Sequence, residues 1–254
     1  MNTITLLNVD ANPKTVKGQS RGYMTAVLYL APYKLAGYNV CGMAEVAGCI
    51  FDCLNTAGRG GIAPADSDTV TLDGGHVVKL NAIQRARIAR TRLFIEDRDT
   101  FMRQFIKEIR AALRRADKLG LTLAVRPDGT SDIRWEDIRL EGKTIFELFP
   151  DIQFYDYTKI PNRRVAHIPN YHLTYSYSAR PTYAQYVQRA LAFYGAGINL
   201  AVVFKGKVPA TFMGRDVVNG DESDLRFLDP KGVIVALKAK GRARKSTSGF
   251  AVAA

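Results

Sequence analysis

The sequence predicts a single-domain α/β protein with a barrel-like, partial TIM-type parallel sheet and flanking helices. Its 254 residues fit one domain over residues 1–240, followed by a flexible basic tail over 241–254. Hydrophobic residues make up 47% of the chain and charged residues 24%, which excludes disordered and fibrous classes. Runs of β-forming residues alternate with segments of helical periodicity, and this alternation favours parallel strands joined by helices.

The strand predictions rest on short runs of β-branched and aromatic residues bounded by turn residues. A short additional strand is expected at His76–Val78, after the pair Gly74-Gly75. The six runs expected to form the main sheet are 25–31, 121–125, 152–155, 171–175, 198–204 and 233–237.

Helical spacing of apolar residues predicts helices at 44–55, 135–148 and 183–194, and a basic helical region over 82–119. In that region Phe101, Phe105 and Ile109 recur every four residues and should face the core. Residues 84–118 hold eleven Lys or Arg against five Asp or Glu. A second face of this helical region is basic and carries Arg103, Lys107, Arg110 and Arg114. This charge predicts that the face contacts phosphate groups; the alternative is an ordinary solvated helix surface.

The overall charge points to a polyanionic partner. Thirty-six Lys and Arg against 24 Asp and Glu give a net charge of +12, which favours nucleic acid, with improved solubility as the alternative reading. Arg163 and Arg164 lie among the tyrosines of residues 155–186, which could stack on unpaired bases or belong to the core. These two arginines are further candidates for nucleic-acid contacts.

Cys41, Cys49 and Cys53 are the only cysteines, and they lie within 13 residues. An odd number is a poor disulfide framework, whereas thiolates bind zinc and iron-sulfur clusters. The spacing therefore predicts a metal site in the cysteine loop 41–61. The alternative is that three reduced cysteines pack as small apolar side chains.

Polar residues follow the predicted strands of residues 120–237, where the carboxyl ends of parallel strands should meet at one rim. Asp132, Asp156 and Lys159 are the candidate catalytic groups of this rim, and Arg126, Ser176 and Ser178 are candidate cofactor-binding groups.

A glycine-rich loop follows the cysteines, and Gly58, Arg59 and Gly60 could bind an anionic group of a cofactor. The loop does not match a P-loop, and the chain has no H-E-x-x-H motif and no nucleophile elbow. The sequence therefore gives no support for a hydrolase triad or a metalloprotease.

No apolar stretch approaches the roughly 18–20 residues that span a bilayer, and the first residues do not resemble a signal peptide. The expected location is the cytoplasm, with no membrane partner.

Three stretches carry a family resemblance: residues 41–61, 154–159 and 219–224. With them the chain resembles the gene product 88 family of phage and plasmid proteins over most of its length. The resemblance implies an origin in a mobile element and, if the gene is phage-encoded, action in the host cytoplasm.

An early three-cysteine loop followed by strand-helix units is also similar to the radical S-adenosylmethionine enzymes. That similarity implies a [4Fe–4S] cluster on Cys41, Cys49 and Cys53, and a cofactor and substrate cavity lined by the rim residues. The spacing departs from that family's C-x3-C-x2-C pattern.

The function predicted from these features is that of a phage or plasmid nucleic-acid-associated protein with a three-cysteine zinc or iron-sulfur centre, which could modify nucleic acid and use S-adenosylmethionine. One alternative is a non-catalytic nucleic-acid-binding protein of replication or packaging, with structural cysteines. The other is an enzyme acting on a small phosphorylated metabolite.

Overall fold

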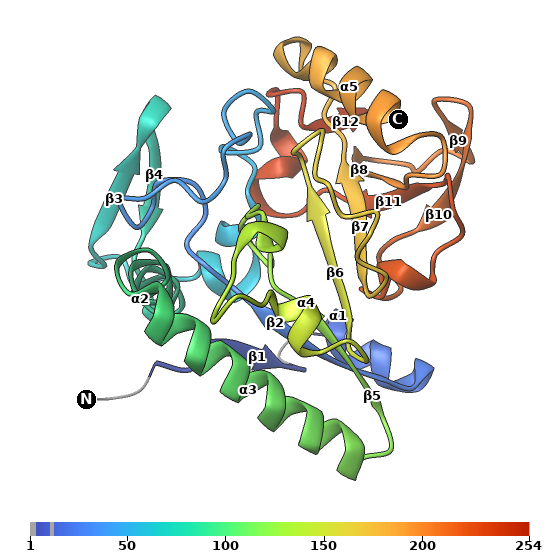
Figure 1. Cartoon of the computed structure of the whole chain (residues 1–254). Coiled ribbons are helices and arrows are strands. Elements are labelled where there is room, and N and C mark those ends of the chain that lie inside the picture. The colour runs from blue at the N-terminus through green and yellow to red at the C-terminus, as the bar shows by residue number, and fades with distance from the viewer. Residues whose placement is uncertain (1–3, 11–12, 254) are drawn as a thin grey trace.

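The computed structural model describes residues 4–10 and 13–253, which form one α/β domain around a ten-stranded sheet (Figure 1). The strand order is β1-β2-β5-β6-β7-β8-β11-β10-β9, and β12 pairs with β8 outside this path. The strands of this sheet are β1 (Leu7–Val9), β2 (Tyr23–Leu28), β5 (Thr122–Arg126), β6 (Gln153–Thr158), β7 (Tyr171–Ser176), β8 (Leu200–Lys205), β9 (Thr211–Phe212), β10 (Arg215–Asn219), β11 (Ile234–Lys238) and β12 (Ala251–Ala253).

The main strands are parallel and follow one another in chain order from β2 to β8. β11 and β10 continue the parallel sheet beyond β8. Short antiparallel strands, β1 and β9, occupy its two edges, and no pairing within the described residues joins them. All six predicted strands, and with them the α/β class, are confirmed, but the sheet is open and not a closed barrel.

Helices flank the sheet, and α3 and α5 cover the same face, because Leu173 of β7 packs with α3 and Tyr175, on the same face of β7, packs with α5. The helices are α1 (Pro13–Val16), α2 (Ala82–Glu96), α3 (Arg98–Lys118), α4 (Ile145–Leu148) and α5 (Ala184–Tyr194). α3 runs across the sheet near β1, β2 and β5, while α5 lies at the opposite end near β8 (Figure 1). The predicted apolar face of α3 is confirmed, because Phe101, Phe105 and Ile109 are fully buried in the largest core cluster.

The predicted basic helical region is confirmed as two helices. Asp97 ends α2 with an extended backbone (φ −141°) and caps α3, its Oδ1 accepting a hydrogen bond from the Thr100 N–H at 3.1 Å. Within the described residues, no helix has both the length and the apolar character needed to cross a membrane.

Two predicted helices are wrong. Residues 42–52 form a succession of turns, because Gly48 has φ +72°, which a right-handed helix does not contain, and its backbone packs closely against Arg180 and the Ser248 carbonyl. Residues 135–148 form only a 3-10 turn (Trp135–Asp137) and α4. A tight turn at Glu141 and Gly142, both with positive φ, interrupts the helical path between them.

The segment expected to be a flexible basic tail packs on the domain. Gly241–Lys245 form a 3-10 turn, and β12 pairs in parallel with β8. The carboxylate of Asp52 accepts hydrogen bonds from the hydroxyls of Ser246 and Ser248. These bonds fasten the C-terminal segment to the cysteine loop; residue 254 lies outside the described residues.

A separate hairpin of β3 (Thr69–Leu72) and β4 (His76–Lys79) confirms the short strand predicted at 76–78. Leu72 and Val78 pack with Tyr33 and Ile50 in a small core cluster, to which Cys41 and Cys49 also belong. The hairpin therefore supports the cysteine loop from the side opposite the main sheet.

Candidate functional site

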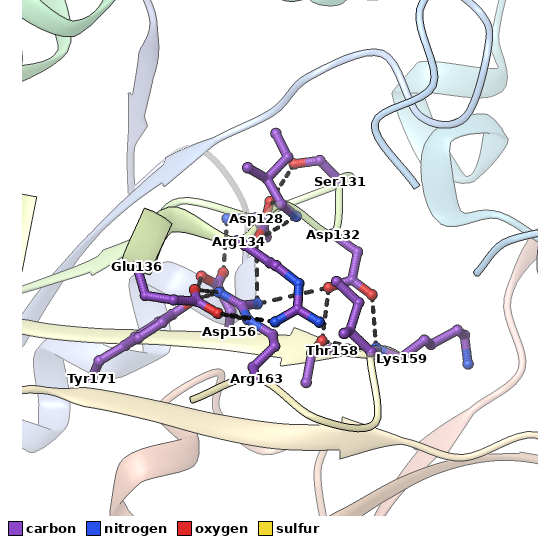
Figure 2. A network of polar contacts seen from close by, with 12 residues as sticks. Asp128, Ser131, Asp132, Arg134, Glu136, Asp156, Thr158, Lys159, Arg163 and Tyr171 are labelled. Carbon is purple, nitrogen blue, oxygen red and sulfur yellow. Dashed lines mark hydrogen bonds and ion pairs between the residues drawn. The ribbon is translucent and has the colours of Figure 1, made fainter. Parts of the chain in front are cut away.

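A buried polar network lies at the carboxyl ends of β5, β6 and β7 (Figure 2). The loop after β5 contributes Asp128, Asp132 and Glu136, and β6 contributes Asp156. These groups meet because β5, β6 and β7 are adjacent and parallel, so their carboxyl ends share one edge of the sheet.

Arg163 is the cation at the centre of this network. Its Nε and Nη2 donate to the two carboxylate oxygens of Glu136 at 3.0 and 2.6 Å, and Nη2 also donates to the Tyr171 hydroxyl at 2.7 Å. Its Nη1 lies 3.8 Å from Asp128 and 3.7 Å from Asp132. Arg163 is only 1% exposed, so its predicted contact with nucleic acid is wrong; Arg164 is exposed.

Asp128 and Asp156 form a closely coupled buried pair. The Asp156 carboxylate accepts hydrogen bonds from the Asp128 N–H at 2.7 Å and from the Tyr171 hydroxyl at 2.9 Å. Burial raises the pKa of both carboxyls; the negative charge of Asp132 raises the pKa of Asp128 further, and the negative charge of Asp128 raises that of Asp156. Asp156, a predicted catalytic group, is therefore fully buried and bonded within the network.

Asp132 and Lys159 occupy the outer side of the network. Asp132 accepts hydrogen bonds from the Thr158 hydroxyl at 2.8 Å and from the Lys159 N–H at 2.7 Å. The Lys159 amine points away from the carboxylates (Figure 2) and donates to the Ser176 carbonyl and hydroxyl, both at 3.0 Å. The structure thus brings together three of the predicted rim residues, Asp132, Lys159 and Ser176.

Burial lowers the pKa of Lys159, which is 8% exposed. The Phe250 ring of the C-terminal segment covers the amine, at 4.7 Å from its centroid. A desolvated lysine amine of lowered pKa has more of its free-base form, which is the form that accepts a proton or attacks an electrophile. Lys159 is therefore the most chemically competent group of the rim.

The cysteine loop lies on the same strand ends. Cys41 forms a β-bridge with Asp132, and the Ser178 hydroxyl donates to the Ala47 carbonyl at 2.8 Å. The charges of Lys159 and Asp132 both act on the pKa of the Cys49 thiol, Lys159 lowering it and Asp132 raising it. The predicted convergence of the cysteine loop with the strand-end loops is therefore found in the structure, and Ser178 holds the loop in place.

The thiols do not fit a zinc or iron-sulfur centre in this arrangement. Cys41 and Cys49 each direct Sγ at a backbone carbonyl at 3.7 Å, and Cys53 Sγ accepts the Asn55 N–H. Burial raises the pKa of all three thiols, that of Cys49 to about 11. No three His, Cys, Asp or Glu side chains in residues 4–10 and 13–253 are grouped to hold a metal ion.

The other predicted cofactor-binding residues lie outside the Lys159 network. Arg126 forms an ion pair with Asp224 at 3.1 Å and stacks over the Tyr157 ring. Gly58, Arg59 and Gly60 belong to a 3-10 turn that is fastened to the start of α2, where the Arg59 and Gly60 carbonyls accept from the Asn81 amide. This turn is stabilised through its carbonyl groups.

Sequence reasoning did not select three members of the network, Asp128, Glu136 and Tyr171, as catalytic or cofactor-binding groups. Asp128, Asp132 and Glu136 recur every four residues after a predicted strand, a signal that the sequence does contain. Their shared partner Arg163 follows 27 residues after Glu136 and could be recognised only once β5 and β6 were paired.

A basic stripe on α3, defined by Arg103, Lys107, Arg110 and Arg114, is a second candidate surface. All four side chains are exposed, as predicted, and Arg103 pairs with Glu141 at 2.8 Å. The other three cations have no ion pair among the described residues, because Glu108 turns toward β1 and accepts the Leu6 and Leu7 N–H groups. The stripe therefore presents uncompensated positive charge.

Comparisons with known proteins give one match. Neither a curated protein nor a solved structure shows significant similarity to the chain. The sequence profile described as gene product 88 matches residues 5–254, nearly the whole chain. The stretches that suggested this relationship contain the cysteine loop and the end of β6, which are the parts that meet at the strand ends. The chain therefore belongs to the gene product 88 family.

Proposed function

We propose that this is a nucleic-acid-associated protein that contacts phosphate groups through the basic stripe of α3. The observation that carries the proposal is the row of three exposed cations, Lys107, Arg110 and Arg114, without ion-pair partners among the described residues. At about 1.5 Å per residue the stripe extends about 17 Å from Arg103 to Arg114, long enough to reach several phosphates of one strand.

Two further features support the proposal. The net charge of +12 gives the whole molecule a field that attracts polyanions. Membership of the gene product 88 family supports a phage or plasmid origin, and with it action in the host cytoplasm.

The proposal is tested by fluorescence anisotropy with labelled duplex DNA, single-stranded DNA and RNA over a series of salt concentrations. The double variant Arg110→Glu/Arg114→Glu should bind more weakly. Its plot of log affinity against log salt should also be shallower by about two, because each lost phosphate contact removes roughly 0.9 from the slope on duplex DNA.

A charge-matched control is available at the opposite end of the molecule. Arg189→Glu/Lys231→Glu changes the net charge by the same amount, and both residues are exposed near α5 and β11. This control should bind nearly as the wild type does. Equal losses in both double variants would contradict a contact surface on α3.

Modification of nucleic acid is a second candidate function, and the observation that favours it is Lys159. Its amine, of lowered pKa, lies at the strand ends beside Ser176 and near Cys49. After incubation of an oligonucleotide with the protein and S-adenosylmethionine, mass spectrometry should show a product that Lys159→Met does not form. An unchanged oligonucleotide mass with the wild-type protein would leave binding alone as the function.

A further inference from the structure

A cavity of about 600 Å³ lies at the carboxyl ends of β8 and β11. Its size falls within the range of small-molecule sites, roughly 300–1,000 Å³. Its lining comes from α1 and the turn after it, from the ends of β8 and β11, and from the segments after these strands, and it includes no residue of α3. The cavity is therefore separate from the basic stripe.

The lining of this cavity is strongly cationic. Five of its side chains are positively charged and one is a carboxylate; they are Lys17, Lys205, Lys238, Lys240, Arg244 and Asp221. Asp221 accepts from the Lys240 amine at 3.1 Å, so one cation is compensated and four positive charges remain.

Several of these cations are held in position. The Lys205 amine donates to the Ser246 carbonyl at 2.7 Å, and Arg244 Nε donates to the Ala239 carbonyl at 3.4 Å. The docked C-terminal segment thus supplies Arg244 and fixes Lys205. Lys17 and Lys238 have exposed side chains whose amines have no partner among the described residues, so their charges are free for a ligand.

We propose that this cavity binds a small molecule carrying a di- or triphosphate group. The four uncompensated charges match the three to four negative charges of a triphosphate, and lysine amines are well suited to phosphate oxygens as point charges. The position agrees with the general placement of ligands beyond the carboxyl ends of parallel strands. A duplex would not enter a cavity of this volume, so the site differs in ligand from the stripe on α3.

The proposal is tested by isothermal titration calorimetry of the full chain with inorganic tripolyphosphate and with ATP at low salt. Both should bind, and ATP should bind more tightly than tripolyphosphate if the site also recognises the nucleoside. The double variant Lys17→Gln/Lys238→Gln should weaken binding at least tenfold. Since neither amine has a partner within residues 4–10 and 13–253, the melting temperature of this variant without ligand should equal that of the wild type.

Arg110→Gln/Arg114→Gln is the matched control, because it removes the same charge from the stripe. It should leave tripolyphosphate affinity unchanged and weaken oligonucleotide binding, while the cavity variant should do the reverse. The absence of binding heat at millimolar tripolyphosphate, or equal losses in both variants, would overturn the proposal. A failure of oligonucleotide binding alone would overturn the proposed function and leave this site standing.

Discussion

Arg163 is the fully buried guanidinium at the centre of four acidic side chains, Asp128, Asp132, Glu136 and Asp156, and the half-exposed Arg134 reaches Glu136 from outside at 4.0 Å. A buried cation with one bidentate partner and three nearby carboxyls holds the loop after β5 against the ends of β6 and β7. Because burial raises the pKa of Asp128 and Asp156, we expect this network to retain protons at neutral pH.

Replacing this cation should destabilise the protein strongly. We expect Arg163→Met to lower the free energy of unfolding by about 3–5 kcal/mol at pH 7, because it leaves buried carboxylates without a partner. The loss should shrink as the pH falls toward 4, since protonation removes the unpaired charges and the variant's carboxyls take up protons more readily in the folded state. Urea unfolding at several pH values measures this.

Arg163→Lys is the control for charge alone. It keeps the cation but loses the two-point contact with Glu136, so its loss should be smaller and should depend little on pH. A pH-independent loss in Arg163→Met would show that packing, and not charge, is the main contribution of this residue.

The thiol of Cys49 should react slowly. Burial raises its pKa to about 11 from an ordinary value of 9.0. At pH 8 the folded chain should therefore contain about 100-fold less Cys49 thiolate than the unfolded chain, since each pKa unit is a factor of ten. Alkylation with iodoacetamide, located by tandem mass spectrometry, should be slower in the native protein by about that factor.

The reference for the alkylation rate is the same protein unfolded in urea, in which all three cysteines are exposed. Native Cys49 that reacts as fast as unfolded Cys49 would show that the loop opens or that a cation activates the thiol.

At the scale of single elements, α3 combines two surfaces on one helix. Its apolar side, with Phe105 and Ile109, packs on β1, β2 and β5, while its opposite side carries the basic stripe. Residues three and four positions apart share a face of a helix, so the 21-residue helix keeps these surfaces separate along its length.

This separation predicts different effects of substitution on the two sides. Phe105→Ala should lower the free energy of unfolding by about 3–5 kcal/mol, the usual range for removing a buried ring. Arg110→Glu/Arg114→Glu should change it by less than about 1 kcal/mol, because both side chains are exposed. Chemical denaturation of both variants tests the assignment, and a large loss in the arginine variant would mean that the stripe supports the fold.

At the scale of the whole molecule, the net charge of +12 opposes the folded state through repulsion among its cations. Raising the salt concentration from about 50 to 500 mM should therefore raise the melting temperature of the free protein, because it shortens the Debye length. The rise should be smaller in Arg110→Glu/Arg114→Glu than in Arg189→Glu/Lys231→Glu, since the stripe places cations one helical turn apart. Calorimetric melting at each salt concentration decides between a local and an overall effect of charge.

Local chemistry in the chain was enough to predict the α/β class, all six main strands, the basic and apolar sides of α3 and the relation to the gene product 88 family. It was also enough to place Asp132, Lys159 and the cysteine loop at one rim, because the carboxyl ends of neighbouring parallel strands must meet.

Other features depend on contacts between distant residues, which periodicity does not contain. The turns at 42–52 replace a helix because Gly48 packs against Arg180 and the C-terminal segment. Arg163 is buried and not exposed as predicted, because it donates hydrogen bonds to Glu136 and Tyr171. Residues 241–253 likewise dock because β12 pairs with β8 and Ser248 donates a hydrogen bond to Asp52. This docking brings Arg244 to the cationic cavity, which no local sequence pattern predicts. A strand or a helical face is specified by neighbours in sequence, whereas a buried charge network requires its partners to be brought together first.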